Sequence, residues 1–307
     1  MTPNTPQLPR PITLIVNANS RKGRTAFRSA VAAVRAAGIP LVEGHAVKNK
    51  HETLNLLRRE VEAGANTVIV GGGDGTLSEC AGHLIHTQVA MGVLPLGTGN
   101  TFARSIGIPL GLEEAAQTIA DGCIQTIDVG RVNGQVFLNS VSLGLSCEIA
   151  GALDKRTKRR LGLLSWPVIG ARVIATHHPI VLKITSEEKS FPVRTHQLLV
   201  VNGRYVAGPI AASPEASVQD SHFDVFVLGG AKKGALARIA WQWLRGQHTQ
   251  SPEARYFKTQ KLRVESTRRA LPANVDGDIN ENTPLDMEVL PGALRVVVPR
   301  GFEARQV

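Results

Sequence analysis

Apolar and polar residues follow two rhythms along this chain, and the first rhythm alternates between two kinds of segment. Short, almost wholly apolar runs are separated by stretches in which apolar residues recur every three or four positions. Side chains repeat every two residues in a strand and about every 3.6 in a helix, so the runs predict strands and the stretches predict helices. The expected strands are residues 12–16, 41–47, 67–70 and 89–94, and the expected helices are residues 25–37, 51–63 and 77–86. This alternation predicts an α/β fold with a doubly wound, mostly parallel sheet.

The second rhythm begins near residue 124, where short β-like runs replace the alternation. Runs of this kind, bounded by turn residues, favour a β-rich and mostly antiparallel arrangement. The expected strands are residues 127–132, 136–141, 180–184, 197–201, 223–228, 261–265 and 294–298, and the expected helices are residues 163–176 and 234–244. We therefore predict two domains, residues 1–122 and 123–307, with the last residues as candidates for a return to the first domain.

Composition narrows the choice of partners. The chain has 307 residues, 43% of them hydrophobic, which is enough for one large or two medium cores. The formal net charge of +10 favours polyanionic partners such as nucleic acid, nucleotide or an anionic membrane. Aromatic residues make up only 4%, which argues against nucleic acid recognised by base stacking. We expect no nucleic-acid partner.

Cysteine usage and hydropathy indicate the compartment. Cys80, Cys123 and Cys147 are widely spaced and match neither a disulfide framework nor a zinc site. Reduced thiols of this kind are typical of the cytoplasm. Residues 1–10 lack the apolar core of a signal peptide, and no run approaches the ~20 apolar residues that span a membrane. We expect a soluble cytoplasmic protein that is at most peripheral to the membrane.

The most informative motif is the glycine loop at residues 71–76, directly behind the apolar run at residues 66–70. A strand that breaks into glycines delivers a tight loop whose backbone amides can approach an anion closely. Asp74 places a carboxylate in that loop, where it could hold Mg²⁺ or orient a hydroxyl. The loop predicts a site for nucleotide phosphates.

A second glycine loop, at residues 96–100, follows the next expected strand. Ligands bind at the carboxyl ends of parallel strands, so the two loops should face one cleft. Thr98 offers a hydroxyl and Asn100 an amide there; taken alone, the loop also fits a simple turn and helix cap. Neither loop has the P-loop spacing or the G-x-G-x-x-G pattern, which argues against dinucleotide redox chemistry.

A pair of acids far downstream completes the candidate chemistry. Asp276 and Asp278 flank Gly277, a pattern that by itself fits an ordinary hairpin turn. Phosphoryl transfer to an alcohol needs positioning, magnesium and a base, and a carboxylate base contributes roughly 10²–10⁴-fold. Asp74, Asp276 and Asp278 therefore compete for the roles of magnesium ligand and base.

Taken together, these motifs resemble the diacylglycerol kinase catalytic family, which includes bacterial lipid kinases and sphingosine kinases. The matching segments lie in collinear order over nearly the whole chain: residues 17–20, 72–79, 95–104, 128–130, 214–220, 275–278, 283–284 and 296–299. The resemblance implies an α/β nucleotide-binding domain, a β-rich lipid or substrate domain, and a cleft between them.

The resemblance also implies roles for individual residues. Contacts to ATP would come from Asn17, Ala18, Asn19, Ser20, Arg21, Gly72, Gly73, Asp74, Gly75, Thr76, Leu77, Ser78, Thr98 and Asn100. Asp278 stands where the family has a glutamate proton acceptor, with Asp276 as the neighbouring acid. A structural Mg²⁺ would be held by Ser217, Asp220 and His222. The chain departs from the family pattern at Thr101, where an aspartate is usual, and at Asp278, which is one methylene shorter.

Two segments are candidates for contact with a membrane. Residues 155–160 form a dense cationic run before several leucines, and residues 235–245 carry Trp241 and Trp243. Basic clusters beside apolar residues suit anionic headgroups. A solvated charged face and a core-packed helix are the alternatives.

The sequence thus favours a magnesium-dependent lipid kinase of lipid metabolism that transfers the γ-phosphoryl group of ATP to a hydroxyl of diacylglycerol or a related lipid. It would visit anionic lipid at the inner face of the membrane. Two alternatives stay open: an NAD kinase-like phosphotransferase, and a non-catalytic regulator of the same fold that binds lipid or nucleotide. The oligomeric state is also open, a homodimer included.

Overall fold

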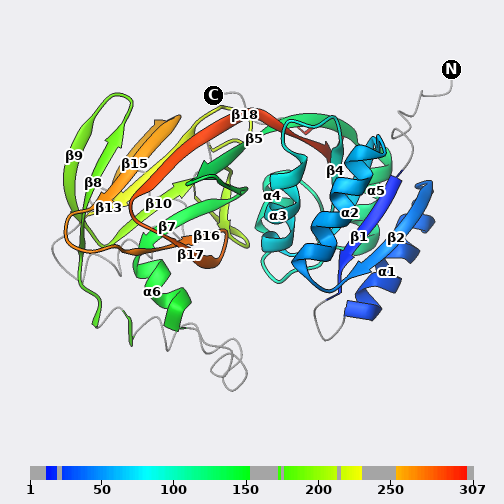
Figure 1. Cartoon of the computed structure of the whole chain (residues 1–307), viewed down its shortest axis with the longest axis horizontal. Coiled ribbons are helices and arrows are strands. Elements are labelled where there is room, and N and C mark those ends of the chain that lie inside the picture. The colour runs from blue at the N-terminus through cyan, green and yellow to red at the C-terminus, as the bar shows by residue number, and fades with distance from the viewer. Residues whose placement is uncertain are drawn as a thin grey trace.

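A computed structural model describes residues 12–18, 23–152, 172–173, 176–212, 216–229 and 254–302. These residues form two lobes, an N-terminal α/β domain and a C-terminal β-rich domain, and one long strand runs through both (Figure 1). The two-domain division at residues 122 and 123 stays a prediction, because that strand belongs to both lobes.

The N-terminal domain is built on parallel strands in the order β2-β1-β3-β4. Its strands are β1 (Ile12–Asn17), β2 (Leu41–Val47), β3 (Thr67–Gly72) and β4 (Ala90–Pro95), and its helices are α1 (Gly23–Ala36), α2 (Lys50–Glu62), α3 (Asp74–Leu84), α4 (Thr101–Ser105) and α5 (Leu112–Asp121). Helix α1 packs against α5, and α2 packs against α3. Both faces of the sheet are covered, which explains why every residue of β3 and β4 is buried.

The C-terminal domain is a two-layer β structure. It contains β5 (Cys123–Val132), β6 (Gln135–Phe137), β7 (Ser140–Gly144), α6 (Leu145–Ala152), β8 (Ile180–Ser186), β9 (Ser190–Thr195), β10 (Gln197–Val201), β11 (Tyr205–Ala207), β12 (Ile210–Ala211), β13 (Phe223–Leu228), β14 (Ala254–Thr259), β15 (Lys261–Ser266), β16 (Pro272–Val275), β17 (Asp278–Asn282) and β18 (Leu285–Val298). One layer is an antiparallel sheet in the order β14-β13-β10-β7-β16-β17. Its apolar face packs on the other layer, where Phe137 stacks against Phe223.

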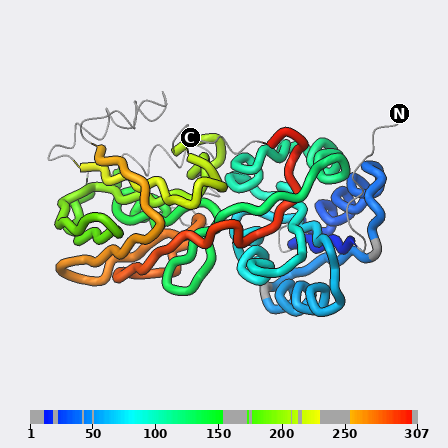
Figure 2. The backbone as a smooth tube through the Cα atoms, turned by 90° about the horizontal axis from the view of Figure 1, so that it is seen from above, coloured from blue at the N-terminus to red at the C-terminus, as the bar shows by residue number. Residues whose placement is uncertain are grey.

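Strand β18 joins the two domains. Its last part pairs in parallel with β4, at Arg295 and Ala90, while its first part pairs antiparallel with β15, at Leu285 and Val264. Strand β5 pairs with it antiparallel along most of its length. Figure 2 shows this strand, in red, crossing from one lobe to the other. A single ten-stranded sheet therefore runs through the molecule.

The fold class predicted from the sequence is confirmed, and the structure corrects it in places. The expected strand at residues 136–141 is two strands, β6 and β7, separated at Leu138 and Asn139. Helix α5 and strand β14 were not predicted. The hairpin turn that the pattern of Asp276, Gly277 and Asp278 fits by itself is present, and it joins β16 to β17. The expected helix at 234–244 and the cationic run at 155–160 lie outside the described residues, as does almost all of the expected helix at 163–176.

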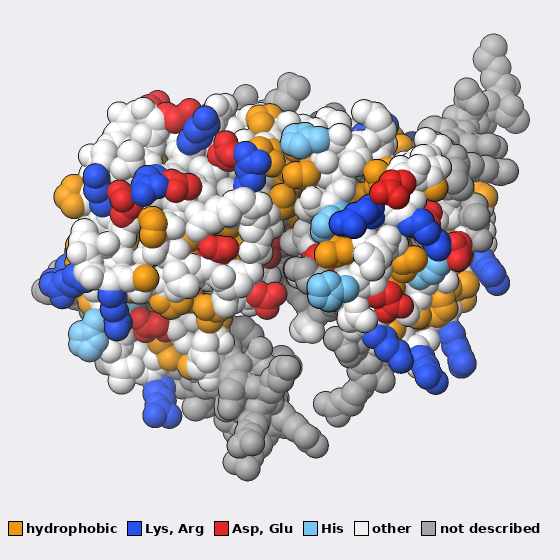
Figure 3. Space-filling model, viewed as in Figure 1, with side chains coloured by type: hydrophobic (Ala, Val, Ile, Leu, Met, Phe, Trp, Pro, Cys, Tyr) orange, Lys and Arg blue, Asp and Glu red, His pale blue; other side chains and the backbone are white. Residues whose placement is uncertain are grey.

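Charged side chains of both signs are mixed on the surface of the described residues (Figure 3). On the face seen in Figure 3, Lys and Arg side chains are interspersed with Asp and Glu on both domains, and a notch separates the two lobes. Among the described residues, no helix is long and apolar enough to cross a membrane.

Candidate functional site

The two glycine loops lie against each other at the carboxyl ends of β3 and β4. The amide of Leu96 donates to the carbonyl of Gly72 at 2.9 Å, which holds the loops together as the strands end. A Cβ atom added to Gly97 would lie 2.5 Å from the Cα of Gly73. Only glycine permits this approach of backbone to backbone, so the two loops lie side by side as predicted.

Helix α3 begins in the first of these two loops. Its N-cap is Gly73, which has no side chain to cap the first amides of the helix. Amides at a helix N-terminus that lack intrahelical partners form a binding site for anions such as phosphate. The N-terminus of α3 therefore offers backbone amides to an anion, and the phosphate site expected at this loop stays a prediction.

Asp74 bridges the two loops. Its Oδ1 atom accepts a hydrogen bond from the amide of Phe102 at 2.9 Å, at the start of α4. Its Oδ2 atom lies 3.2 Å from the position that a Cβ at Gly99 would occupy, and no described hydrogen bond involves it. One carboxylate oxygen is thus used in the fold, and the other faces the glycine loop with the donor chemistry that Mg²⁺ prefers.

Asn100 shapes the second loop from within. Its side-chain oxygen accepts from the Gly97 amide at 2.8 Å, and its side-chain nitrogen donates to the Gly97 carbonyl at 2.9 Å. Its backbone adopts a left-handed conformation, with φ of 49°. Both ends of the amide are therefore committed to the loop, while Thr98 is exposed. Asn100 therefore fixes the shape of the loop, and the nucleotide contacts expected of Asn100 and Thr98 stay predictions.

The end of β1 contacts helix α3 beside the first glycine loop. Asn17 Nδ2 donates to Thr76 Oγ1 at 2.8 Å, and the amide of Ala18 donates to the carbonyl of Val47 at 2.6 Å. Asn19, Ser20 and Arg21 lie outside the described residues. Of the remaining expected ATP contacts, Leu77 is fully buried in the core and can offer a ligand only its backbone.

Asp276 reaches the site from the C-terminal domain, and its carboxylate is fully occupied. Oδ1 accepts from the amides of Asn139 and Ser140 at 2.8 and 2.9 Å, and Oδ2 accepts from the amide of Leu138 at 2.7 Å and from the Ser78 hydroxyl. Burial raises the pKa of this carboxyl against the lowering effect of the four hydrogen bonds. The Ser78 bond ties α3 to the C-terminal domain, so Asp276 holds the two halves of the site in register.

Asp278, in contrast to Asp276, lies at the surface beside a cavity. It is exposed, and its carboxylate makes no hydrogen bond to the described residues. Its Oδ2 atom lies 3.6 Å from the position that a Cβ at Gly75 would occupy, at the first turn of α3. A cavity of about 380 Å³ adjoins it and is also lined by Gln135, Asn280 and His83. Of the two downstream acids, Asp278 is the one with a carboxylate available for chemistry.

Asp220 and its neighbours in the loop make hydrogen bonds within the loop and an ion pair with Lys258 of β14. Asp220 Oδ1 accepts from the amide of His222 at 3.1 Å, and Oδ2 lies 2.8 Å from Lys258 Nζ. Ser217 Oγ accepts from the amide of Gln219 at 3.1 Å. The structure therefore brings Ser217, Asp220 and His222 into one loop, and it adds a lysine that the sequence did not point to.

Asp128 supports that loop from β5. It accepts hydrogen bonds from the amides of Ser221 and Gly292, at 2.7 and 2.8 Å, and it is buried. Burial raises its pKa, the two amides lower it, and the nearby charge of Asp220 raises it further. Asp128 thereby fastens the loop to both β5 and the bend in β18.

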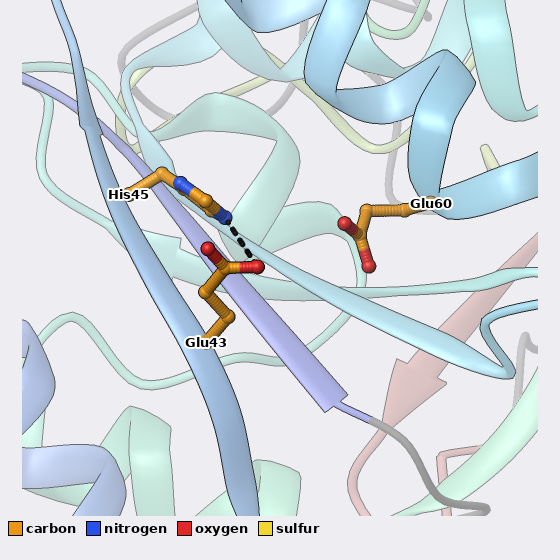
Figure 4. Close-up of side chains that lie close together, drawn as sticks. All are labelled: Glu43, His45 and Glu60. Carbon is orange, nitrogen blue, oxygen red and sulfur yellow. Dashed lines mark ion pairs between the residues drawn. The ribbon is translucent and has the colours of Figure 1, made fainter. Parts of the chain in front are cut away.

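A third group of titratable side chains lies at the β2 edge of the parallel sheet. Glu43, His45 and Glu60 place their ligating atoms within 4.8 Å of one another (Figure 4). The Arg59 guanidinium lies 2.8 Å from Glu43 and 3.1 Å from Glu60, and Thr13 donates to Glu60 at 2.7 Å. These carboxylates already have a cationic partner. Glu43 and His45 lie on β2, the strand at the edge of the sheet, and Glu60 lies in α2.

The comparisons with known proteins agree with the geometry. Residues 11–132 match a family described as the diacylglycerol kinase catalytic domain, and residues 139–298 match one described as the YegS C-terminal NAD kinase beta sandwich-like domain. A Pseudomonas aeruginosa protein named "Probable lipid kinase YegS-like" is 31% identical over 94% of both chains. The chain belongs to the diacylglycerol kinase family.

Other members of the family are also similar to this chain. A protein named "Diacylglycerol kinase" from Bacillus subtilis is 30% identical over 76% of this chain and 78% of its own. A crystal structure of a diacylglycerol kinase from Bacillus anthracis has the same fold, with a TM-score of 0.77 and 24% identity over 94% of this chain and 97% of that chain. The family resemblance inferred from the motifs is confirmed.

Two structural contacts at the site had no counterpart in the sequence reasoning. The Gly208 amide, between β11 and β12, donates to Thr101 Oγ1 at 3.0 Å, which ties α4 to the C-terminal domain. Thr101 was noted only as a departure from the family pattern, because its burial and its contact with a residue 107 positions away are set by the tertiary fold. Lys258 stands in a strand that was not predicted, so no local pattern indicated it.

Proposed function

We propose that this member of the diacylglycerol kinase family is an ATP-dependent lipid kinase, with Asp278 as the base that accepts the proton of the acceptor hydroxyl. One observation carries the proposal: the available carboxylate of Asp278 faces the first turn of α3 across the gap between the domains. A hydroxyl placed between that carboxylate and a phosphate on the glycine loop would be activated for attack on the γ-phosphorus.

Magnesium fits the same arrangement. Asp74 offers one carboxylate oxygen beside the glycine loop, and Mg²⁺ in kinases is usually bound by one or two carboxylates together with substrate phosphates. The ion would supply charge neutralisation on the phosphates. The chain itself supplies the amides that orient them, and Asp276 and Ser78 fix the distance between the phosphate cradle and the base.

The acceptor is proposed to be diacylglycerol or a related lipid, met at an anionic membrane surface on the cytoplasmic side. The names of the relatives support this class of acceptor. An NAD kinase-like reaction is the second candidate, supported by the description of the C-terminal match as NAD kinase beta sandwich-like.

The test is transfer of labelled γ-phosphate from ATP in the presence of magnesium, with NAD and vesicles containing diacylglycerol offered in parallel. Label in the organic phase supports the lipid kinase, and label in NADP supports the alternative. The Asp278→Asn variant should keep ATP binding and lose kcat by about 10²–10⁴-fold. Asp286→Asn, which removes an exposed acid paired with Arg263, is the matched control and should keep activity. Full activity of Asp278→Asn would disprove the assignment of the base.

A further inference from the structure

Lys258, on strand β14, reaches the acidic loop where the family resemblance implies a divalent cation. Its ammonium is 2.8 Å from Asp220 Oδ2. Strand β14 also pairs Lys258 directly with Asp224 of β13, so the two side chains share a face of the sheet. Asp224 is buried, and it accepts a hydrogen bond from the Tyr256 hydroxyl at 2.5 Å. The lysine thus pairs with Asp220 and lies across from the buried Asp224 in the sheet.

The pair is well shielded from solvent. The Lys258 side chain is 25% exposed and that of Asp220 is 15% exposed. An ion pair that is mostly removed from water is screened little by salt, so the ammonium is a strong local positive charge. A carboxylate in such a place needs a positive partner, because an unpaired buried charge is strongly destabilising.

The rest of the loop is satisfied by the chain itself. The second oxygen of Asp220 accepts the His222 amide, and the Ser221 amide donates to Asp128. Ser221 takes a left-handed conformation with φ of 58°, and its hydrogen bond to Asp128 holds it there. These internal contacts fix the shape of the loop around Asp220.

We propose that the ammonium of Lys258 takes the place of a divalent cation at this loop, so that the chain neutralises Asp220 with its own side chain. A divalent ion bound to Asp220 Oδ2 would have to sit beside an ammonium group within hydrogen-bond distance of the same oxygen, and two cations at such a separation repel each other. The oxygen atoms of this loop are the type of ligand that Mg²⁺ prefers, but the charge of Asp220 is already balanced by Lys258. The lysine also fastens β14 to the loop, which a free ion cannot do.

The proposal has a consequence that distinguishes it from a merely structural salt bridge. Replacing Lys258 by methionine would leave Asp220, with Asp128 and Asp224 nearby, without that positive charge. Carboxylates and backbone carbonyls grouped in this way bind hard divalent cations. The Lys258→Met variant should therefore acquire a dependence on divalent cations that the natural chain lacks.

The experiment measures metal content and thermal unfolding without nucleotide, so its outcome is separate from that of the proposed kinase reaction. The full chain is equilibrated with millimolar MgCl₂ or MnCl₂, passed through a desalting column, and assayed for bound metal by mass spectrometry. Unfolding is then followed with EDTA or with MgCl₂ at matched ionic strength. We expect the natural chain to retain far less than one equivalent of metal and to unfold at the same temperature in both solutions.

Variants complete the test. Lys258→Met should unfold several degrees lower in EDTA and recover in MgCl₂, and the added Asp220→Asn change should abolish that recovery. Lys258→Arg should keep the metal-independence, and Lys261→Met, which removes an exposed lysine on the next strand, should behave like the natural chain. The proposal is overturned if the natural chain holds about one equivalent of Mg²⁺ or Mn²⁺ that Asp220→Asn removes. That measurement needs only the natural chain and one variant, so it decides the question even if Lys258→Met does not fold.

Discussion

Removal of the Asp276 carboxylate should destabilise the protein far more than removal of its neighbour Asp278. Asp276→Ala deprives three backbone amides, those of Leu138, Asn139 and Ser140, of their acceptor, and it also frees the Ser78 hydroxyl. A hydrogen bond to a charged acceptor contributes about 1.5–3 kcal/mol, and a buried donor left without an acceptor costs about 1–3 kcal/mol.

The expected magnitude follows from these contacts. The Ser78 hydroxyl can rotate to another partner, so the three amides determine the size of the effect. The alanine variant no longer has to bury a carboxylate, and this gain offsets part of the loss from the amides. The free energy of unfolding should fall by about 3–5 kcal/mol. Asp276 has φ of 50°, and alanine tolerates that conformation less well than Asp, which adds to the loss. Asp276→Asn keeps one acceptor oxygen and should lose roughly half as much.

Urea unfolding of the purified variants is the assay. Asp278→Ala is the matched control, because it removes an exposed acid two residues away with no described hydrogen bond; a surface substitution of this kind should change stability by less than about 0.5 kcal/mol. Both alanine variants should lose kinase activity, but only Asp276→Ala should lose stability. If Asp276→Ala unfolded at the same urea concentration as Asp278→Ala, the positioning role of Asp276 would be refuted.

Three further outcomes are expected. Gly97→Ala should weaken ATP binding, measured by calorimetry, by more than tenfold, because its Cβ would lie 2.5 Å from the Cα of Gly73 and push the loops apart; unchanged affinity would mean that the loops do not act as one cradle. Thr101→Val should lower stability by about 1–3 kcal/mol and speed hydrogen exchange at the Gly208 amide, which loses its acceptor; protection equal to that of the natural chain would contradict the assigned hydrogen bond. Burial raises the pKa of the Cys80 thiol to about 12, so this thiol should resist a thiol-specific reagent at pH 8 until the protein unfolds, and rapid labelling of the native chain at this position would disprove its burial.

The nucleotide half of the site could be predicted because its signals are local. A buried strand that ends in glycines can be recognised from a few consecutive residues, and the structure places the loops at residues 71–76 and 96–100 together as expected. The helix at Leu112–Asp121 also had a usable local signal, since Ala115, Ala116 and Ile119 lie on one buried face.

The roles of the two downstream acids could not be separated from the sequence. Asp276 and Asp278 differ because three amides more than a hundred residues earlier donate to one and not to the other. The same amides explain why the expected strand at residues 136–141 is interrupted: around Leu138 and Asn139 the backbone donates to a carboxylate instead of a neighbouring strand. A local pattern carries no information about such a distant acceptor.

Strand β14 was missed for a different reason. Its sequence, Ala254–Thr259, has charged residues at Arg255 and Lys258 and mostly partly exposed side chains, so it contains no long apolar run. The pairing with β13 is what makes it a strand, and that pairing also brings Lys258 to Asp224. The Lys258–Asp220 pair therefore could not be predicted from the sequence, because it depends on the pairing of β14 with β13.

Strand β18 has a consequence for how the chain folds as it is synthesised. The edge of β4 that faces β18 gains its partner at Arg295, about two hundred residues after Ala90 has been made. At about 5–20 residues per second, the nascent N-terminal domain would wait roughly 10–40 s with this strand edge uncovered. An unpaired strand edge is a template for wrong pairing with other chains. Efficient production of this protein should therefore depend on what shields the edge of β4 during that interval, and a chain released before β18 would be prone to aggregate.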